Sequence, residues 1–435
     1  MKMGNAIKAA VPLFLVLLVT GCMATDGAKM PSGGIFGSKS ADEQGTVSTG
    51  ERSGVISQLS DRRSLLPAGG TYDQIAKAVL SSNLAPAEAE LRAAKLRAEA
   101  QSKNWLPTIG PSLSLTSLGD FVASLVIEQV LFDNGRKKAE REFSVADVEV
   151  AAVLLSQDTN ERVYDALDLY LSAEEGRDIA TQANIALKDM EKFRWIMEQR
   201  VAGGVSDLSD LSILNHKISE IKSDRRLGEE KAATAMAELE AMGAENSKAL
   251  SGLSAVSVDP EITRDLSVLK AHAEKDRDIA RAKIERASNL PGLKATATGI
   301  GGSSDIDAAL QTTGIFDLGM GARLKAVDAT KEAASRKVDL AHESADRRLS
   351  TLGKTYVAAK RATGEAENLT RQAKQNLDVF QSQYEAGQRQ IMDVVGVYET
   401  YARQKRSQIG HKYDAARAQL KMARDMGLLA DGAEI

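Results

Sequence analysis

The residue types that most often carry chemistry are few in this chain and lie far apart. It has one cysteine, Cys22, and four histidines, at positions 216, 272, 342 and 411. A single cysteine excludes a disulfide scaffold and a cysteine-based structural zinc site, and the histidines have no ligand-like spacing. The glycine-rich stretch 299–302 lacks a following Gly-Lys-Ser/Thr, so it reads as a turn and not as a phosphate loop. We therefore predict that the chain is not an enzyme and that it holds no metal or cofactor.

The composition favours long helices over a conventional enzyme core. Of the 435 residues, 27% are charged and only 4% are aromatic, and Ala, Leu, Glu, Lys, Arg and Gln dominate long stretches. Lys and Arg number 56 against 60 Asp and Glu, a formal net charge of −4. This balance excludes nucleic-acid binding driven by positive charge.

The first residues have the pattern of a secretory signal. Lys2 and Lys8 precede an apolar run at 11–19, which ends in Thr-Gly-Cys at 20–22. The run is shorter than the roughly 20 apolar residues of a membrane-spanning helix. Val-Thr-Gly-Cys at 19–22 resembles a bacterial lipobox, which implies a signal peptide of residues 1–21 and a lipidated Cys22. The alternative is an ordinary signal peptide with an incidental cysteine. Met23, in place of an aspartate, favours the outer membrane by analogy.

A tether is predicted to follow the signal. Residues 22–70 are rich in Gly, Ser, Thr, Asp and Lys and have little apolar periodicity. Such a composition is typical of a flexible linker. We expect no packed structure in this segment.

The positions of the prolines leave room for two very long helices. None lies between 112 and 259, and none after 291, and a proline inside a helix costs about 3 kcal/mol. Apolar residues recur every three or four positions over 136–201, and a second candidate helix covers 323–385. A helix of this length would run roughly 100 Å, which predicts lateral coiled-coil packing.

The chain also contains an internal duplication. One offset of 184 residues relates Leu-Pro at 106–107 to Leu-Pro at 290–291, Phe-Asp at 132–133 to Phe-Asp at 316–317, and Ala-Gly at 202–203 to Ala-Gly at 386–387. We predict a first repeat over 71–246, a linker over 247–260, a second repeat over 261–427 and a tail over 428–435. Each repeat reads helix, strand, strand, long helix, turn, helix, and the first helix is expected over 72–105.

The strand pairs have the length of membrane strands, and the first pair begins with their alternation, which is poorer in the second repeat. Ile109, Pro111, Leu113 and Leu115 alternate with small or polar residues, and a second strand is expected over 121–132. The second repeat has candidates at 293–300 and 308–316. About ten residues suit a tilted membrane strand, and the alternative is a soluble hairpin that caps a helical bundle. Four strands cannot close a barrel, and an open edge cannot face lipid, so several identical chains must share one barrel.

Taken together, these features resemble the TolC-type outer-membrane efflux and export channels. The resemblance covers residues 71–427 and rests on the signal with Cys22, the duplication, the Leu-Pro before each strand pair and Leu-Phe-Asp-Asn-Gly-Arg at 131–136. The strongest match is Tyr-Glu-Ala-Gly-Gln-Arg-Gln-Ile-Met-Asp-Val at 384–394, similar to the second helical-hairpin tip of that family. Residues 200–208 are similar to the first tip. The second copy, at 315–320, departs by lacking a basic residue after the glycine.

The resemblance implies a mainly α fold with a small β part, in which a long coiled-coil α-helical barrel crosses the periplasm. It implies a homotrimer whose twelve strands form one β-barrel in the outer membrane. The strand-to-helix turns would comprise Phe132, Asp133, Gly135, Phe316, Asp317 and Gly319. Ser112, Ser114 and Thr116 would face a wet lumen, and Ile109, Leu113 and Leu115 would face lipid.

The hairpin tips are the candidate docking site in this reading. They would face an adaptor (membrane fusion) protein from an inner-membrane pump of the RND or ABC type. The residues concerned are Arg200, Gly203, Gly204, Val205, Ser206, Gly387, Gln388 and Arg389. Glycines there permit the positive φ that ends one helix and starts the next.

Three aspartates lie at or just beyond the tips. In a threefold assembly Asp207, Asp210 and Asp393 would form acidic rings at the mouth of the tunnel and favour cations. The alternative is that they cap the returning helices. Arg389 and Tyr398 are further candidates that would brace a closed mouth through bonds between helices.

The predicted function is passive conduction in a tripartite efflux or type I secretion system. The chain would reside, lipid-anchored, in the outer membrane of a Gram-negative bacterium, with a large periplasmic extension and no nucleic-acid partner. The alternative is a lipid-anchored periplasmic coiled-coil scaffold without a pore. Small-molecule efflux and protein secretion both remain open, because the adaptor and pump choose the cargo.

Overall fold

The computed structural model describes residues 54–82, 86–115, 121–258, 265–300, 306–313 and 319–432. The chain divides into two units, residues 1–51 and 52–435, and the architecture below is that of the second. The predicted signal peptide and Cys22 lie outside the described residues. So do the strand turn at 117–120, the loop at 301–305, and Phe316 and Asp317 of the second strand-to-helix turn.

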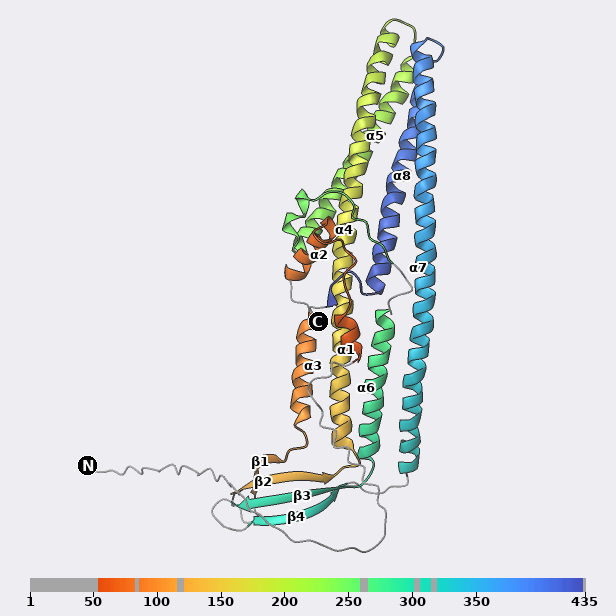
Figure 1. Ribbon diagram of the computed structural model, residues 1–435. Coiled ribbons are helices and arrows are strands. Elements are labelled where there is room, and N and C mark those ends of the chain that lie inside the picture. Colours follow the sequence, from red (N-terminus) through yellow and green to blue (C-terminus); the bar gives the residue numbers. More distant parts are fainter. Residues whose placement is uncertain are drawn as a thin grey trace, which may run out of the picture. The chain divides into compact units, whose positions relative to one another are not determined.

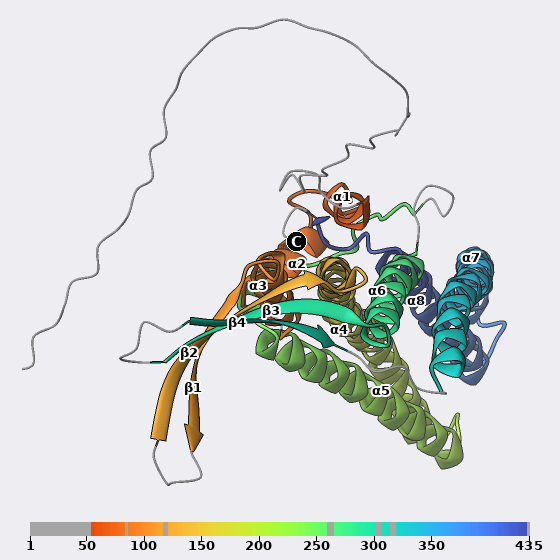
Figure 2. The same ribbon diagram turned by 90° about the horizontal axis from the view of Figure 1, so that it is seen from below.

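Helices in this unit form a wall of four columns, each in contact with its neighbours (Figures 1 and 2). In the half next to the sheet the order is α3, α4, α6, α7, and in the other half it is α5, α4, α8, α7. The two outer columns are therefore α3 with α5 and α7 alone, and α4 is an inner column. The bounds are α3 Pro86–Ser102, α4 Arg136–Ala202, α5 Leu208–Ala241, α6 Leu266–Ser288, α7 Met320–Glu385 and α8 Ile391–Asp425.

The two longest helices have the extents that the proline gaps predict. Their bounds differ from the predicted ones by at most three residues. Small residues let α4 and α5 approach closely, because a Cβ built on Gly176 would lie 2.6 Å from the carbonyl oxygen of Gly228. Each of these glycines is followed four residues later by an alanine, Ala180 or Ala232. Backbones can meet only where side chains are this small, so the pair fixes where the two helices cross.

A single antiparallel sheet, in the order β1-β2-β3-β4, lies at one end of the wall (Figure 1). Its strands are β1 Thr108–Leu115, β2 Phe121–Phe132, β3 Gly292–Ile300 and β4 Ile306–Thr313. All four predicted strands are present, although the described part of β4 begins two residues earlier than predicted and ends at 313. The edges of the sheet are β1 and β4, one from each half of the chain.

One face of the sheet is largely apolar, as the alternation of β1 predicts, and the other face is mixed, because Val126 and Val130 lie there among polar residues. Register places Ile109 opposite Ile127 and Pro111 opposite Leu125, and these side chains share a face with Leu113 and Leu310. The leucines on this face are exposed; Leu113 retains 75% of its accessible surface. Ser112 and Ser124 pair on the opposite face, where Lys294 Nζ lies 2.9 Å from Glu128 Oε1.

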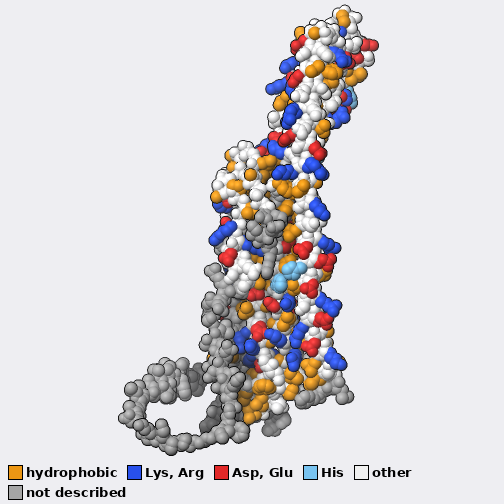
Figure 3. Space-filling view, turned by 45° about the vertical axis from the view of Figure 1, so that its right-hand side comes forward, with side chains coloured by type: hydrophobic (Ala, Val, Ile, Leu, Met, Phe, Trp, Pro, Cys, Tyr) orange, Lys and Arg blue, Asp and Glu red, His pale blue; other side chains and the backbone are white. Residues whose placement is uncertain are grey.

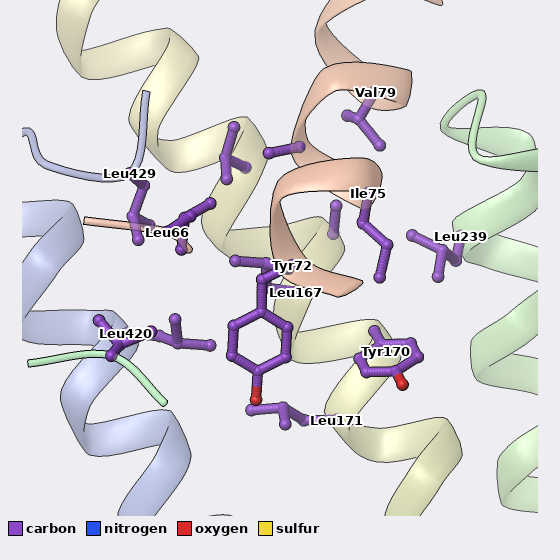
Figure 4. Close-up of a cluster of buried hydrophobic side chains, with 14 of the residues drawn as sticks. Leu66, Tyr72, Ile75, Val79, Leu167, Tyr170, Leu171, Leu239, Leu420 and Leu429 are labelled. Carbon is purple, nitrogen blue, oxygen red and sulfur yellow. The ribbon is translucent and has the colours of Figure 1, made fainter. Parts of the chain in front are cut away.

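A central layer packs on the middle of α4. It comprises α1 Gly54–Ser60, α2 Thr71–Ser82, the 3-10 helix η1 Glu245–Ala249 and the C-terminal segment 426–432. Figure 4 shows its core, in which Tyr72 of α2 lies among Leu167, Tyr170 and Leu171 of α4. The Tyr72 and Tyr170 rings meet edge to face, with centroids 6.2 Å apart, and the Tyr170 hydroxyl donates to the carbonyl of Gly252 at 2.9 Å.

This layer corrects three boundaries predicted from sequence. The flexible tether does not extend to residue 70, because Leu59 and Leu66 are buried in the core. The tail beyond 427 is likewise packed, since Leu428 and Leu429 are buried. Full burial of a leucine contributes about 1.5–3 kcal/mol, which is enough to hold short segments of polar composition. The helix expected over 72–105 is two helices, because Pro86 begins α3.

Along the helices, acidic and basic side chains alternate over the surface, and hydrophobic side chains gather where the helices meet the sheet (Figure 3). None of the helices that the structure describes has an apolar stretch long enough to cross a membrane.

Candidate functional site at the hairpin tips

The turns between α4 and α5 and between α7 and α8 lie together at the end of the wall away from the sheet (Figure 1). Between α4 and α5, Gly204 has φ +71, and its amide donates to the carbonyl of Val201 at 3.0 Å. The amide of Val205 donates to the carbonyl of Arg200 at 2.8 Å, which closes the turn. The Arg200 Nε donates to Ser206 Oγ at 3.0 Å, so the guanidinium braces its own turn. Val205 at the apex is exposed.

The turn between α7 and α8 is built in the same way. Gly387 has φ +72, and the amide of Gln388 donates to the carbonyl of Gln383 at 2.8 Å. Arg389 donates from Nε to Gln383 Oε1 at 3.1 Å, and its guanidinium carbon lies 4.5 Å above the Phe380 ring. Both contacts are with α7, so within one chain Arg389 stabilises its own hairpin.

Of the three aspartates, two occupy capping positions. Asp207 is the N-cap of α5, and its carboxylate accepts from the amide of Ser209 at 3.3 Å. Asp393 lies in the first turn of α8 and accepts from the amide of Gln390 at 3.2 Å. Asp210, in the first turn of α5, is half-buried. None of the three pairs with a cation among the described residues, so all three carboxylates keep acceptor capacity, Asp207 and Asp393 beyond their capping bonds.

The two hairpins are joined at this end by a second hydrophobic core. Its buried members come from α4, α5, α7 and α8. Tyr398 of α8 is almost fully buried there, and its hydroxyl donates to Asp189 Oδ2 of α4 at 2.9 Å. Burial raises the pKa of the Tyr398 phenol and the Asp189 charge raises it further, so the hydroxyl stays protonated as a donor. Tyr398 was predicted from the sequence to form bonds between helices, but its partner Asp189 was not.

A row of similar bonds continues along α4 and α8 beyond the tips. The Tyr413 hydroxyl donates to Asp178 Oδ2 at 2.9 Å, and Arg417 bonds both Asp168 and Glu175 at 2.8 Å. Every donor in this row comes from α8, and every carboxylate comes from α4. Sequence reasoning missed this row, because its only local signal is acidic residues on one helix and tyrosine or arginine on another.

At the opposite end, the first strand-to-helix turn is a closed hydrogen-bonded unit. Asp133 accepts from the amides of Gly135 at 3.0 Å and Lys137 at 2.7 Å, and Gly135 has φ +83. Gly319, its counterpart in the second half, has an ordinary negative φ of −84. The two glycines therefore differ in conformation, in line with the departure of the second copy from the family pattern.

No group of three or more His, Cys, Asp or Glu residues is placed to hold a metal ion in the described ranges. The tips offer hydrogen-bonding groups, exposed apolar side chains and acidic charge. Such a surface is suited to contact with another protein or to electrostatic selection of ions.

Comparison with known proteins identifies the fold. No protein-family model matches the chain, and no curated protein matches its sequence. Among solved structures, a membrane protein from Pseudomonas aeruginosa has a TM-score of 0.74 at 16% identity, over 88% of this chain and 95% of that one. The outer membrane protein VceC from Vibrio cholerae has a TM-score of 0.70 at 14% identity, over 83% and 96%. The Neisseria gonorrhoeae MtrE outer membrane channel has a TM-score of 0.68 at 16% identity, over 86% and 94%. At the level of the fold, these likenesses confirm the resemblance drawn from the sequence.

Proposed function

We propose that this chain, which has the fold of the TolC-type outer-membrane channels, is the channel subunit of a tripartite export system. It would conduct substrate passively from an inner-membrane pump and its adaptor across the periplasm and the outer membrane. We further propose that it acts as a homotrimer, lipid-anchored through Cys22, in the outer membrane of a Gram-negative bacterium. Efflux and type I secretion are both compatible with this role.

The observation that carries the proposal is the open, two-faced sheet. Its apolar face is exposed, and both edge strands lack a neighbour within the described chain. In a bilayer, unpaired backbone groups at an edge cost several kcal/mol each. Pairing β4 of one copy with β1 of the next removes the edges, and three copies supply twelve strands.

The helical wall has open edges too. The buried residues of α7 fall largely on one stripe, in which Val327, Ala334, Ala345 and Leu352 follow one another at spacings of seven, eleven and seven residues. Apolar side chains elsewhere on α7 and on the opposite edge are exposed: Leu340, Val357, Leu369 and Val379 on α7, Leu96 on α3, and Ile213 and Leu227 on α5. A second copy packed edge to edge would bury both sets. A ring closed in this way has a hollow centre, because each column contacts only its neighbours.

The hairpin tips then lie at the periplasmic mouth of the tube. Three copies of Asp207, Asp210 and Asp393 would surround the opening, and the exposed apex residues, such as Val205, would contact the adaptor. Repetition of the acceptor-rich tips concentrates negative potential in a narrow space, which favours cations.

The alternative is a lipid-anchored periplasmic scaffold without a pore. A scaffold has no need of a sheet that exposes leucines on one whole face, because in water such a face favours aggregation. The apolar face therefore favours the channel.

The full chain purified in detergent tests the proposal. We expect a protein mass of three copies, and discrete conductance steps after addition to planar bilayers. A monomer that gives no conductance and remains in solution without detergent would contradict the channel and support the scaffold.

A further inference from the structure

A cavity of about 460 Å³ lies where the β2–α4 turn meets the end of α6. From α4 it is lined by Lys138 and Glu142, and from α6 by Lys283 and Arg286. The Asn134 side chain forms part of the wall and donates to the carbonyl of Pro291 at 2.8 Å, so the β2–α4 turn and the α6–β3 junction are tied together there. The cavity is therefore a feature of a braced corner of the fold.

The charge in this cavity is positive and only partly neutralised. Glu142 Oε2 lies 2.6 Å from Lys283 Nζ, which accounts for one of the three cations. Lys138 and Arg286 have no carboxylate partner among the described residues, and both side chains are exposed. Asp133, the nearest carboxylate of the turn, accepts from two backbone amides at the start of α4. Two cations thus remain available to an anion.

The cavity opens on the face of the wall that carries the central layer. Lys138, Glu142, Val145 and Glu149 follow one another at spacings of three and four along α4, which places them on one side of the helix. The same stripe continues to Asn160, whose Oδ1 accepts from the amide of Leu429 in the central layer at 2.8 Å. In the proposed tube this face lies outside, because three copies of the layer would fill the tunnel. Since α4 and α6 are inner columns, a neighbouring copy would leave the cavity uncovered.

Exposed aromatic side chains lie at the same level of the molecule as the cavity, where the strands join the helices. Trp105 retains 61% and Phe132 58% of its accessible surface, at the junctions of the strands with the helices. Trp105 follows Asn104, whose Oδ1 accepts from Arg141 of α4 at 2.6 Å, so it is fixed next to the first turns of α4. Tryptophan at the border of an apolar band and a polar region is typical of a membrane interface.

From this combination we propose that the cavity binds the phosphate of an anionic phospholipid headgroup in the leaflet that faces the helices. Lys138 and Arg286 pair with the phosphate, and the acyl chains lie along the apolar face of the sheet. The same phosphate chemistry would also fit free inorganic phosphate, but the exposed Trp105 and Phe132 beside the cavity favour the lipid. The inference rests on the proposed function, because it requires the sheet to lie in a bilayer.

Quenching of Trp105 by brominated lipids tests the inference. The chain has two tryptophans, so Trp195→Phe in the full chain leaves Trp105 as the only reporter. The protein is reconstituted into phosphatidylcholine vesicles that contain equal mole fractions of brominated phosphatidylglycerol or brominated phosphatidylcholine. We expect a relative binding constant about thirtyfold higher for phosphatidylglycerol, from two cations near the surface. Lys138→Gln with Arg286→Gln should reduce the ratio to about one, as expected when both charges are removed.

A matched control uses Arg63→Gln with Lys188→Gln, which removes the same charges from exposed positions between α1 and α2 and in α4 near the tips. It should keep the preference. Equal quenching by both lipids, or a preference that survives Lys138→Gln with Arg286→Gln, would overturn the headgroup site while leaving membrane insertion intact. A preference abolished by inorganic phosphate would assign the cavity to the free anion instead. Absence of quenching by either lipid would contradict the proposed function itself.

Discussion

Leu125 offers the sharpest test of which face of the sheet meets lipid. It is the fifth residue of β2, paired with Pro111 of β1 and Gly299 of β3, and retains 52% of its accessible surface. Its neighbour Ser124 is paired on both sides at the same level, but points to the opposite face. Leu125→Arg and Ser124→Arg therefore place the same charge one residue apart on opposite sides of one strand.

The expected difference between the two variants is large. An arginine on the lipid face of a barrel costs about 2–4 kcal/mol near the midplane, so three copies together cost about 6–12 kcal/mol. An arginine on the lumen face stays hydrated, and its main effect is on the field inside the pore. Since a folded protein is stable by only about 5–15 kcal/mol, Leu125→Arg should prevent most of the chain from inserting.

The assay follows insertion of the full chain into vesicles, by protection from protease, and conductance in planar bilayers. We expect Leu125→Arg to show little insertion, and Ser124→Arg to insert and conduct with a shift toward anions. Equal insertion of the two variants would refute the assignment of faces. Loss of insertion for Ser124→Arg alone would reverse it.

Three further predictions concern the tips. Tyr398→Phe removes the hydrogen bond to Asp189 and leaves a carboxylate oxygen without this donor. The free energy of unfolding should therefore fall by about 1–3 kcal/mol in a denaturant titration. The control Tyr401→Phe, at a half-buried neighbour, should change the free energy of unfolding far less. Gly204→Ala should destabilise the α4–α5 turn by about 1 kcal/mol, because φ +71 strains an L-residue, whereas Gly203→Ala, at φ −81, should be tolerated; equal melting temperatures would show that the turn relaxes. Replacing Asp207, Asp210 and Asp393 together by Asn should lower the cation-to-anion permeability ratio in planar bilayers, and an unchanged ratio would leave these residues with only their capping role.

Local patterns predicted the regular elements well. Proline-free stretches and apolar spacing predicted α4 and α7 to within three residues, and alternation predicted the strands and their two faces. These patterns can be recognised because side chains return to the same face every 3.6 residues in a helix and every two residues in a strand. The tip glycines were found for the same reason, since a positive φ is a local demand.

The burial of short segments could not be predicted from such local patterns. The helix α1 and residues 428–430 are too short to show a period, yet Leu59 and Leu429 are buried. Their environment comes from α4 and the rest of the central layer, which are distant in sequence. Burial by a remote surface leaves no local pattern to detect.

The candidate site at the hairpin tips likewise has local features, which the sequence predicts, and contacts between distant residues, which it does not. Sequence determined that two glycine turns with nearby aspartates end the long helices, because each turn is built within about ten residues. The caps are local as well, because Asp207 and Asp393 accept from amides two and three residues away. Only the tertiary structure decided that Tyr398 bonds Asp189, 209 residues away. That pairing depends on how α4 and α8 slide and rotate against each other, and the side chains that both helices contribute to two hydrophobic cores set this register.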